Sequence, residues 1–253
     1  MANTFLLSYS ARAVPRPDSH RRGLAAAPCR RRRWQRVAAA VLGLTLAGAG
    51  GSAARAQLPE SRDPARLRAG VLLYAAPSIG DSRFAQTVVL LLEHGRNGSM
   101  GVVINQPSDT PLRKVLPSVP EARRLEVPVY WGGPVQPEGV TVLLRSPLRV
   151  EGARMILPDV YLTTQLEALR SALDDRRPDR EIRVYAGYAG WSPGQLEREV
   201  RLGAWFLDRA DAEFVFTLDP DSLWERVRSI MRRQQAWLAW PAAGVGMRRA
   251  LTS

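Results

Sequence analysis

Two apolar runs on either side of a polar turn predict a β-hairpin in the first half of the chain. Two runs rich in β-branched and apolar residues, 87–92 and 100–105, are separated by the turn residues Gly95-Arg96-Asn97-Gly98. Two such runs joined by a Gly/Asn turn are typical of a hairpin. We expect side chains to alternate in direction along each strand and to pair across the hairpin, Val88, Leu90 and Leu92 with Val102 and Ile104.

The same patterns predict further strands and helices around this hairpin. The expected strands are 71–74, 127–131, 140–144, 182–186, 204–207 and 213–216. Capping residues or prolines before apolar positions three or four apart predict helices that start at Thr110, Thr164, Ser192 and Asp219. With no internal repeat or inner linker, the sequence favours one mixed α/β (α+β) domain over residues 70–240, followed by a C-terminal tail, 241–253.

The first 56 residues have the order of a secretory signal peptide. The basic run 30–36 precedes the apolar h-region 37–49, and Ala54-Arg55-Ala56 is a small-residue processing site. An apolar run of about thirteen residues is shorter than the roughly twenty that a membrane-spanning helix needs. We predict cleavage after Ala56, with residues 57–69 as a linker. An uncleaved anchor, a disordered basic tail, or a protein start downstream of Met1 are the alternatives.

Charge and cysteine content narrow the function classes. The formal net charge is +12, but residues 1–56 hold ten arginines and one acid, so the other 197 residues carry only +3 of it. A nearly neutral mature chain argues against nucleic-acid binding, which needs clustered Lys and Arg. One cysteine (Cys29) and two histidines exclude a disulfide framework and a Cys- or His-rich metal centre. We therefore predict no metal and no cofactor.

The N-terminal segment also sets the expected compartment. A cleaved signal predicts a periplasmic or secreted protein that contacts the membrane only through that segment. A cytoplasmic protein is the alternative if the N-terminus is a mis-assigned start. No feature of the sequence identifies a partner.

His94 is the only histidine of the predicted mature chain and would be the base of any Ser-His-Asp site. Ser99, Ser108 or Ser192 would then be the nucleophile, but no G-x-S-x-G elbow exposes one of them. Neighbouring Glu93 would point to the opposite side of the strand. A structural or surface histidine is the favoured interpretation.

The segment 187–197 is the densest motif of the chain, with glycines, two aromatic residues and a helix start. It predicts a tight strand-to-helix turn. We expect Trp191 to fill the core beside this turn and the Ser192 hydroxyl to cap the helix by accepting from the N–H of Gln195. In the alternative interpretation, Trp191 is exposed in a functional cleft near Glu93 or Glu199.

Several separate motifs follow one another in order between about Gly70 and Trp224, namely Gly98–Asn105, Gly132-Gly133-Pro134-Val135, Gly187–Trp191, Gly194–Glu197 and Ala204-Trp205. Together they resemble the signature of the YqgE/AlgH family of bacterial proteins. The resemblance implies a curved mixed sheet that closes into a pseudo-barrel flanked by helices. It also implies a family without an established enzymatic activity, named for an association with the regulation of alginate synthesis. The candidate site residues carried by these motifs are Glu93, His94, Asn105, Gly132, Gly133, Pro134, Gly187, Tyr188, Gly190, Trp191, Gly194, Gln195, Glu197, Glu199 and Trp205.

The chain departs from the family pattern at several places. Arg145 stands where a histidine is usual, and Gly203 replaces the usual asparagine before Ala204-Trp205. The region after Trp224 differs from the usual ending, and the signal segment is an addition to a family regarded as cytoplasmic. If the family histidine had a catalytic role, this chain would lack it.

Three functions follow from these patterns. The favoured one is a non-enzymatic regulatory or ligand-binding protein. The alternatives are an enzyme with a small acid/base site that uses Glu93, His94 or Glu199, and a transcriptional regulator, as the family name suggests.

Overall fold

The predicted hairpin is confirmed and lies at the centre of one half of the sheet. Strand β3 (Val88–Gly95) pairs antiparallel with β4 (Gly98–Val103), and Leu90 lies opposite Val102. The register shifts between Leu91 and Glu93, where the hairpin has a bulge. Even-numbered apolar side chains of the two strands pack into one core, and odd-numbered ones into another.

The computed structural model of the chain describes residues 7–8, 14–17, 62–123, 127–174, 181–216 and 219–238, all of them in one compact unit. The predicted h-region, the cleavage site and the C-terminal tail lie outside these residues.

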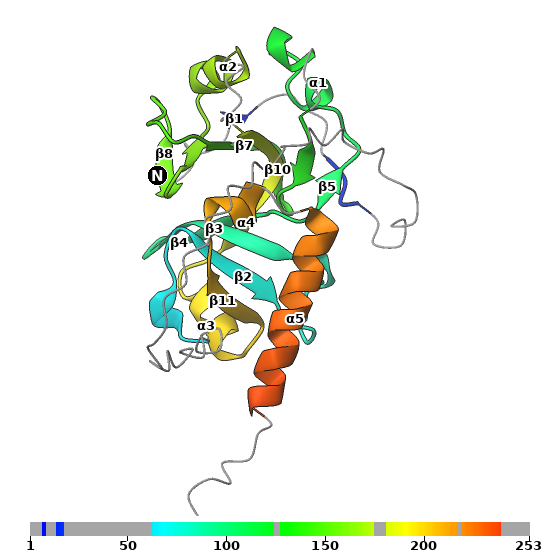
Figure 1. The fold of residues 1–253 in the computed structure, drawn as a ribbon, viewed down its shortest axis with the longest axis vertical. Helices are drawn as coiled ribbons and strands as arrows, with labels where there is room; N and C mark the ends of the chain where they lie inside the picture. Colours follow the sequence, from blue (N-terminus) through cyan, green and yellow to red (C-terminus); the bar gives the residue numbers. More distant parts are fainter. Residues whose placement is uncertain are drawn as a thin grey trace, which may run out of the picture. The chain divides into compact units, whose positions relative to one another are not determined.

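The strands form one curled sheet with the order β11-β2-β3-β4-β10-β7-β9-β8 (Figure 1). Short strands extend it, since β1 pairs with β7, β6 with β10, and β5 with β6. All pairs are antiparallel except β6 with β10. The remaining strands are β1 (Leu7–Ser8), β2 (Val71–Ala75), β5 (Pro107–Ser108), β6 (Val129–Trp131), β7 (Val135–Arg145), β8 (Arg154–Leu157), β9 (Val160–Thr163), β10 (Glu181–Trp191) and β11 (Trp205–Arg209).

Strand β10 joins the two halves of the sheet. Its first part pairs with β6 and β7, whereas its last residues, Ala189 to Trp191, pair with β4. The register against β7 shifts between Ala186 and Tyr188, and Gly187 between them has a φ of 70°. A left-handed residue within a bulge bends a strand, so β10 carries the curl that makes the sheet a half-barrel.

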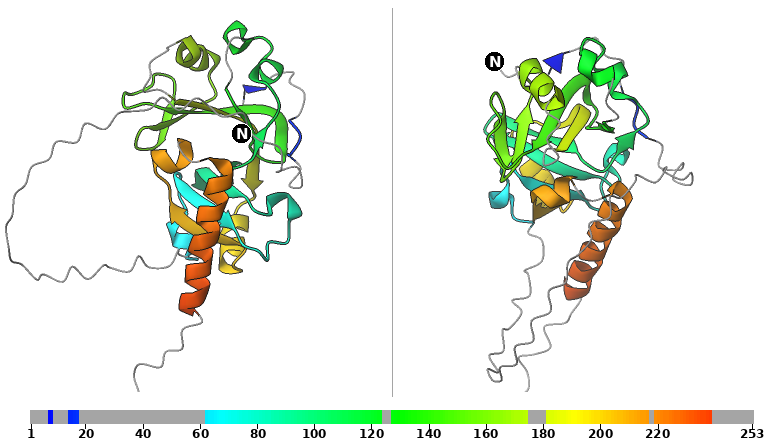
Figure 2. Two further views of the ribbon diagram at one scale, coloured as in Figure 1. Left: turned by 45° about the vertical axis from the view of Figure 1, so that its right-hand side comes forward. Right: turned by 45° about the horizontal axis from the view of Figure 1, so that its top comes forward.

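The concave face of this half-barrel holds the main core. Apolar side chains from both halves meet there, among them Tyr74, Leu90, Leu143 and Tyr185. Helices α4 and α5 cover the same core, and α5 runs alongside β2 and β11 in Figures 1 and 2. The helices are α1 (Leu112–Val115), α2 (Leu166–Asp174), α3 (Gln195–Arg201), α4 (Ala212–Phe216) and α5 (Pro220–Leu238), with 3₁₀ helices η1 (Pro64–Arg66), η2 (Ser82–Phe84) and η3 (Pro120–Arg123).

The outer face of each half of the sheet packs into a hydrophobic core of its own. Leu196 and Val200 of α3 pack on β2, β3 and β11, while α1, α2 and Val14 pack on β7 and β10. The expected single domain with a curved mixed sheet and flanking helices is therefore confirmed. None of the helices in the described ranges combines the length and the apolar character required to cross a membrane.

Several sequence predictions of local structure are wrong. Residues 213–216 form helix α4 instead of a strand, because Asp211 accepts a 2.6 Å hydrogen bond from the N–H of Phe214 and starts a helical turn. Residues 187–191 belong to strand β10, and the strand-to-helix turn comes only after Trp191. The helix predicted to start at Thr110 begins at Leu112, and Pro111 is its N-cap residue with no side-chain cap. The predicted start at Asp219 is confirmed, because Asp219 accepts a hydrogen bond from the N–H of Ser222 at the start of α5.

Candidate functional site

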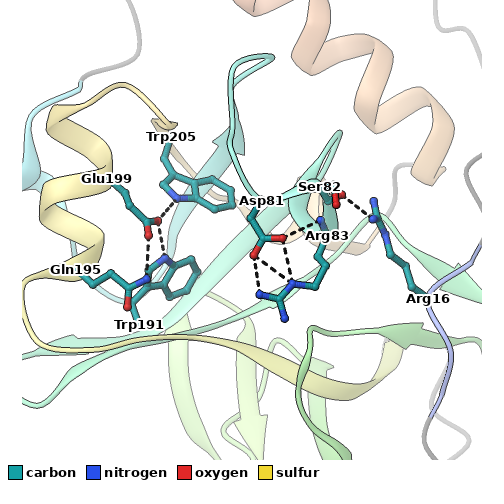
Figure 3. A network of polar contacts seen from close by, with 8 residues as sticks. All are labelled: Arg16, Asp81, Ser82, Arg83, Trp191, Gln195, Glu199 and Trp205. Atoms are coloured by element: carbon teal, nitrogen blue, oxygen red, sulfur yellow. Dashed lines mark hydrogen bonds and ion pairs between the residues drawn. The ribbon is translucent and has the colours of Figure 1, made fainter.

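The carboxylate of Glu199 on α3 binds three side chains. Its Oε2 accepts hydrogen bonds from the indole N–H groups of Trp191, at 3.0 Å, and Trp205, at 2.8 Å. Its Oε1 accepts a 2.9 Å bond from the amide of Gln195. Figure 3 shows the two indoles and the amide pointing toward the carboxylate. Because a charged acceptor strengthens such bonds, Glu199 ties α3 to the ends of β10 and β11.

Around this carboxylate lies a cluster of four aromatic rings. The rings of Trp191 and Trp205 meet edge to face, with centroids 5.8 Å apart. Phe84 stacks on Trp191, at 6.3 Å, and meets Trp205 edge-on, at 5.6 Å, while Trp131 lies 6.5 Å from Phe84. These spacings are within the range of favourable ring pairs, so η2, β6, β10 and β11 are held together by one aromatic contact set.

A cleft of about 350 Å³ opens beside the rings. One wall comes from the segment between β2 and β3, the other from the end of β10 and the start of β11. Its lining residues are Ile79, Gly80, Asp81, Arg83, Phe84, Pro134, Val135, Gly190, Trp191, Gln195, Glu199, Ala204 and Trp205.

An ion pair belongs to this lining. Arg83 Nη2 lies 2.7 Å from Asp81 Oδ2, and the Arg83 Nε–H also donates to Asp81. The hydrogen bond from Arg83 holds the pKa of the Asp81 carboxyl below its usual range, despite the opposing effect of burial, and the positive charge of Arg16 adds to this. Asp81 is therefore an ionised carboxylate with its partner already in place.

The predicted serine cap of α3 is wrong. Gly194, with a φ of 73°, is the N-cap residue and no side chain caps it. The bond runs in the reverse direction, because the N–H of Ser192 donates to Gln195 Oε1 at 3.0 Å. Gln195 thus closes the turn and reaches Glu199 with the other end of the same amide.

Trp191 fills the core beside the turn, as the favoured interpretation predicts, because the residue is only 6% exposed. The exposed Trp191 of the functional interpretation is therefore wrong. Trp191 nevertheless lines the cleft and binds Glu199. Glu93 is exposed on β3 and is not among the residues that line the cleft.

The glycines of two family motifs pack backbone against backbone. A Cβ on Gly132 would collide with the carbonyl of Gly187, and one on Gly133 with the backbone of Tyr188. Tyr188 itself is half-buried against the inner core. These positions hold β10 against the segment before β7, where Pro134 then lines the cleft.

Asn105 has a structural role at the end of the hairpin. Its Oδ1 accepts a 2.8 Å hydrogen bond from the N–H of Val88, and its amide donates to the carbonyl of Gln86 at 2.9 Å. Gln86 has a φ of 59°, a left-handed conformation. Asn105 therefore fixes the strained entry to β3 and does not reach the cleft.

His94, Ser99 and Glu197 form a separate polar row. His94 Nδ1 lies 2.8 Å from Ser99 Oγ, and His94 Nε2 lies 3.9 Å from Glu197 Oε1. Ser99 is opposite His94 in the hairpin and is buried, with 9% of its surface exposed. The row joins the hairpin to α3. Nowhere in the described ranges do three or more His, Cys, Asp or Glu residues gather to hold a metal ion.

Arg145 and Gly203 are two of the departures from the family pattern, and the structure shows the local geometry of each. Arg145 forms a 2.9 Å ion pair with Glu181, its neighbour across β7 and β10. Gly203 has a φ of 77° at the end of α3. Asparagine is the residue that most readily shares such left-handed conformations with glycine, so the change from asparagine leaves this turn feasible.

Asp81 and Arg83 are cleft residues that the sequence did not single out. They are more than one hundred positions away from Glu199, and only the packing of η2 onto the Trp191–Trp205 pair brings them to the cleft. An Asp two residues before an Arg at a turn predicts a local cap, which is present, but it contains no information about a distant cleft.

Comparison with known proteins agrees with this geometry. The family model described as DUF179, AlgH-like, matches residues 72–236. A UPF0301 protein of Myxococcus xanthus is 40% identical over 157 residues, which are 61% of this chain and 85% of that protein. A UPF0301 protein of Thioalkalivibrio sulfidiphilus is 38% identical, over 60% of this chain and 83% of that protein.

Two solved structures share the fold. The solution structure of the AlgH protein from Pseudomonas aeruginosa has 31% sequence identity and a TM-score of 0.55, and covers 68% of this chain and 93% of its own. The crystal structure of DIP2367 from Corynebacterium diphtheriae has 28% identity and a TM-score of 0.53, over 66% and 87%. With the motifs, the curled sheet and a family match over residues 72–236, the chain belongs to the AlgH-like family.

Proposed function

We propose that this chain is a non-enzymatic binding protein with a regulatory role, and that the cleft between η2 and the Trp191–Trp205 pair takes an apolar or ring-bearing group of its partner. The observation that carries the proposal is the aromatic wall of the cleft, fixed in place by Glu199. Rigid aromatic walls with a few placed polar groups are typical of binding sites.

The polar groups of the cleft favour binding over acid/base catalysis. Glu199 has three donors, and Asp81 is paired with Arg83. A general base needs a free lone pair directed at the substrate, and most lone pairs of both carboxylates are directed at partners within the protein. The residues that line the cleft include no Ser, Thr, Cys, His, Lys or Tyr, so the two paired carboxylates are the only side-chain nucleophiles for covalent catalysis in its walls.

The charges of the cleft also argue against a transcription factor that binds DNA here. Two carboxylates and one guanidinium line it, and a phosphate backbone requires an excess of positive charge. A regulatory role would then act through a protein or small-molecule partner.

Export is the second part of the proposal. The basic run 30–36, the apolar run 37–49 and the Ala54-Arg55-Ala56 site support it. Fractionation of cells that express the full chain, followed by N-terminal sequencing, tests it. We expect a periplasmic or secreted protein that begins at Gln57, and an intact N-terminus in the cytosol would contradict export.

Nuclear magnetic resonance of the indole N–H groups tests the cleft. N-acetyl-tryptophanamide serves as a probe for a ring-bearing group, titrated into the ¹⁵N-labelled full chain. We expect the resonances of Trp191 and Trp205 to shift in a saturable way, and that of Trp224, which lies outside the cleft, to stay in place. Unmoved cleft resonances would overturn the proposal.

A matched pair of variants makes this test specific. Val135→Glu places a charge on a half-buried cleft wall, whereas Leu148→Glu places one on a side chain that is 57% exposed and outside the cleft. We expect Val135→Glu to weaken probe binding at least tenfold and Leu148→Glu to leave it unchanged. Equal affinities would show that the probe binds elsewhere.

A further inference from the structure

A short N-terminal segment, which includes β1 and residues 14–17, packs against parts of the domain that are far away in the sequence. Strand β1 pairs antiparallel with β7, Leu7 opposite Val140 and Ser8 opposite Gly139. Val14 follows in the sequence and is 3% exposed, in the core that contains the outer face of β7 and β10. The segment therefore adds a strand to a sheet edge and fills a hydrophobic site beside it, which is how sheet edges bind peptides.

Arg16 makes the specific contacts. Its Nη1 donates a 2.8 Å hydrogen bond to the carbonyl of Ser82, and its Nη2 a 3.1 Å bond to the carbonyl of Ala85. Its guanidinium also lies over the ring of Trp131, 5.7 Å from the centroid. Two carbonyls at the two ends of η2 and the face of one indole thus form a binding site for a planar cation. Figure 3 shows Arg16 reaching Ser82 beside the cleft residues.

The sequence of this segment suits an extended ligand. Residues 14–17 read Val-Pro-Arg-Pro, so both contact residues precede a proline and are biased to the extended region. Prolines also lower the conformational entropy that binding must remove. The prolines therefore favour the extended backbone that the segment adopts when it docks. The domain supplies an apolar site, a sheet edge and a binding site for the arginine guanidinium.

We propose that this surface is a peptide-binding site for an extended protein segment with the chemistry Val-Pro-Arg-Pro, occupied here by the chain's own N-terminus. Residues 7–17 lie upstream of the predicted cleavage site, so removal of the leader would vacate the site for the same kind of segment from a partner protein. The site adjoins the cleft without sharing its lining, because Trp131, Ser82 and Ala85 do not line the cleft, whereas Phe84, 6.5 Å from Trp131, does.

Fluorescence anisotropy of a labelled peptide tests this inference on the full chain. The peptide has the sequence of residues 7–18, and the protein is the variant Val14→Asp/Arg16→Ala, which weakens the docked segment. A tethered ligand has an effective concentration near the millimolar range, so the unmodified chain competes with added peptide. We expect the variant to bind the peptide at least tenfold more tightly than the unmodified chain does.

Peptide variants separate recognition of the arginine from unspecific adhesion. We expect an Arg16→Ala peptide to bind at least tenfold more weakly, and an Arg16→Lys peptide to be weakened as well, since one ammonium does not present a planar fork to two carbonyls. Equal binding of all three peptides, or no binding to a variant whose circular dichroism and melting remain native, would overturn the inference.

A single substitution covers the case in which the double variant fails to fold. The Arg16→Ala chain keeps Val14 in its core and loses only the guanidinium contacts. We expect the Trp131 indole resonance of this variant to move back toward its position in the unmodified chain when free peptide is added. No such recovery at saturating peptide would count against the site. Because the cleft test uses another probe and other resonances, either proposal can fail without the other.

Discussion

Glu199 on α3 and Trp205 on β11 are joined by a 2.8 Å hydrogen bond from the indole N–H to Oε2, and Trp191 on β10 donates to the same oxygen. One carboxylate oxygen therefore satisfies two buried indoles from two strands. An indole N–H can only donate a hydrogen bond. If the Glu199 carboxylate is removed, both indole N–H groups therefore lose their acceptor. The pair fixes the aromatic wall of the cleft before any ligand arrives.

Replacing Glu199, a half-buried residue, is expected to destabilise the domain. Glu199→Ala leaves two buried N–H donors without an acceptor, and each costs about 1–3 kcal/mol. We expect the free energy of unfolding to fall by about 2–5 kcal/mol in urea titrations followed by circular dichroism. Glu197→Ala, two residues away with only a 3.9 Å contact to His94, is the control and is expected to lose less than about 1 kcal/mol. Equal losses would contradict this role of Glu199.

The turn before α3 offers a second test, on the residues where the sequence prediction was wrong. Gln195 accepts from the N–H of Ser192 and donates to Glu199, whereas no hydrogen bond to the Ser192 hydroxyl closes the helix start. We expect Gln195→Ala to lower the free energy of unfolding by about 1–2 kcal/mol and Ser192→Ala to change it by less than about 0.5 kcal/mol. If thermal melts showed that Ser192→Ala destabilises the domain more than Gln195→Ala, the predicted serine cap would be the correct interpretation.

The hairpin was predictable because its information is local. The apolar run over 88–92 and the turn residues up to Gly98 indicate both strands, the period of two sets their facing, and the pairing of Leu90 with Val102 follows. Residues 213–216 were not predictable in this way, because a short apolar run such as Phe214-Val215-Phe216 suits a strand or a buried helix equally well. The Asp211 cap and the place of Phe214 and Val215 in the inner core decided for a helix.

The candidate site was predictable in part. Trp191, Gln195 and Glu199 stand close together in the sequence and in a family motif, so their association was visible early. Asp81 and Arg83 reach the same cleft only through the contact of Phe84 with the two indoles. Contacts between residues so far apart depend on the whole packing of the sheet, and no local pattern encodes them.

The backbone contact between the two glycine motifs predicts that no larger side chain fits at Gly133. A methyl group on Gly133 would collide with the backbone of Tyr188, which cannot move without breaking the bend of β10. We expect Gly133→Ala to cost at least about 3 kcal/mol, the upper range for inserting atoms into a packed interior. The readouts are the soluble yield and the melting temperature.

Gly194 is the matched control for that substitution. It also has a left-handed φ, of 73°, but nothing lies within 4 Å of an added Cβ. Only the conformational cost of about 1–2 kcal/mol applies there. If Gly194→Ala destabilised the domain as much as Gly133→Ala, backbone conformation and not close approach would explain the glycine motifs.

Tyr185 on β10 makes the stability of the domain sensitive to alkaline pH. Complete burial raises the pKa of its hydroxyl, and burial also raises the pKa of Tyr130, whose ring lies 5.4 Å away. An unfolded tyrosine ionises near pH ~10. Since the folded pKa is higher, stability is complete below that pH and falls as the pH rises from the unfolded pKa toward the folded one. We expect a loss of up to about 1.4 kcal/mol per pH unit for each such tyrosine.

The variant Tyr185→Phe removes one ionisable group. Its urea midpoints should therefore decline less between pH 9 and 11, relative to pH 8, than those of the unmodified chain in the same buffers. Identical declines for the two proteins would mean that Tyr185 does not contribute to the alkaline loss.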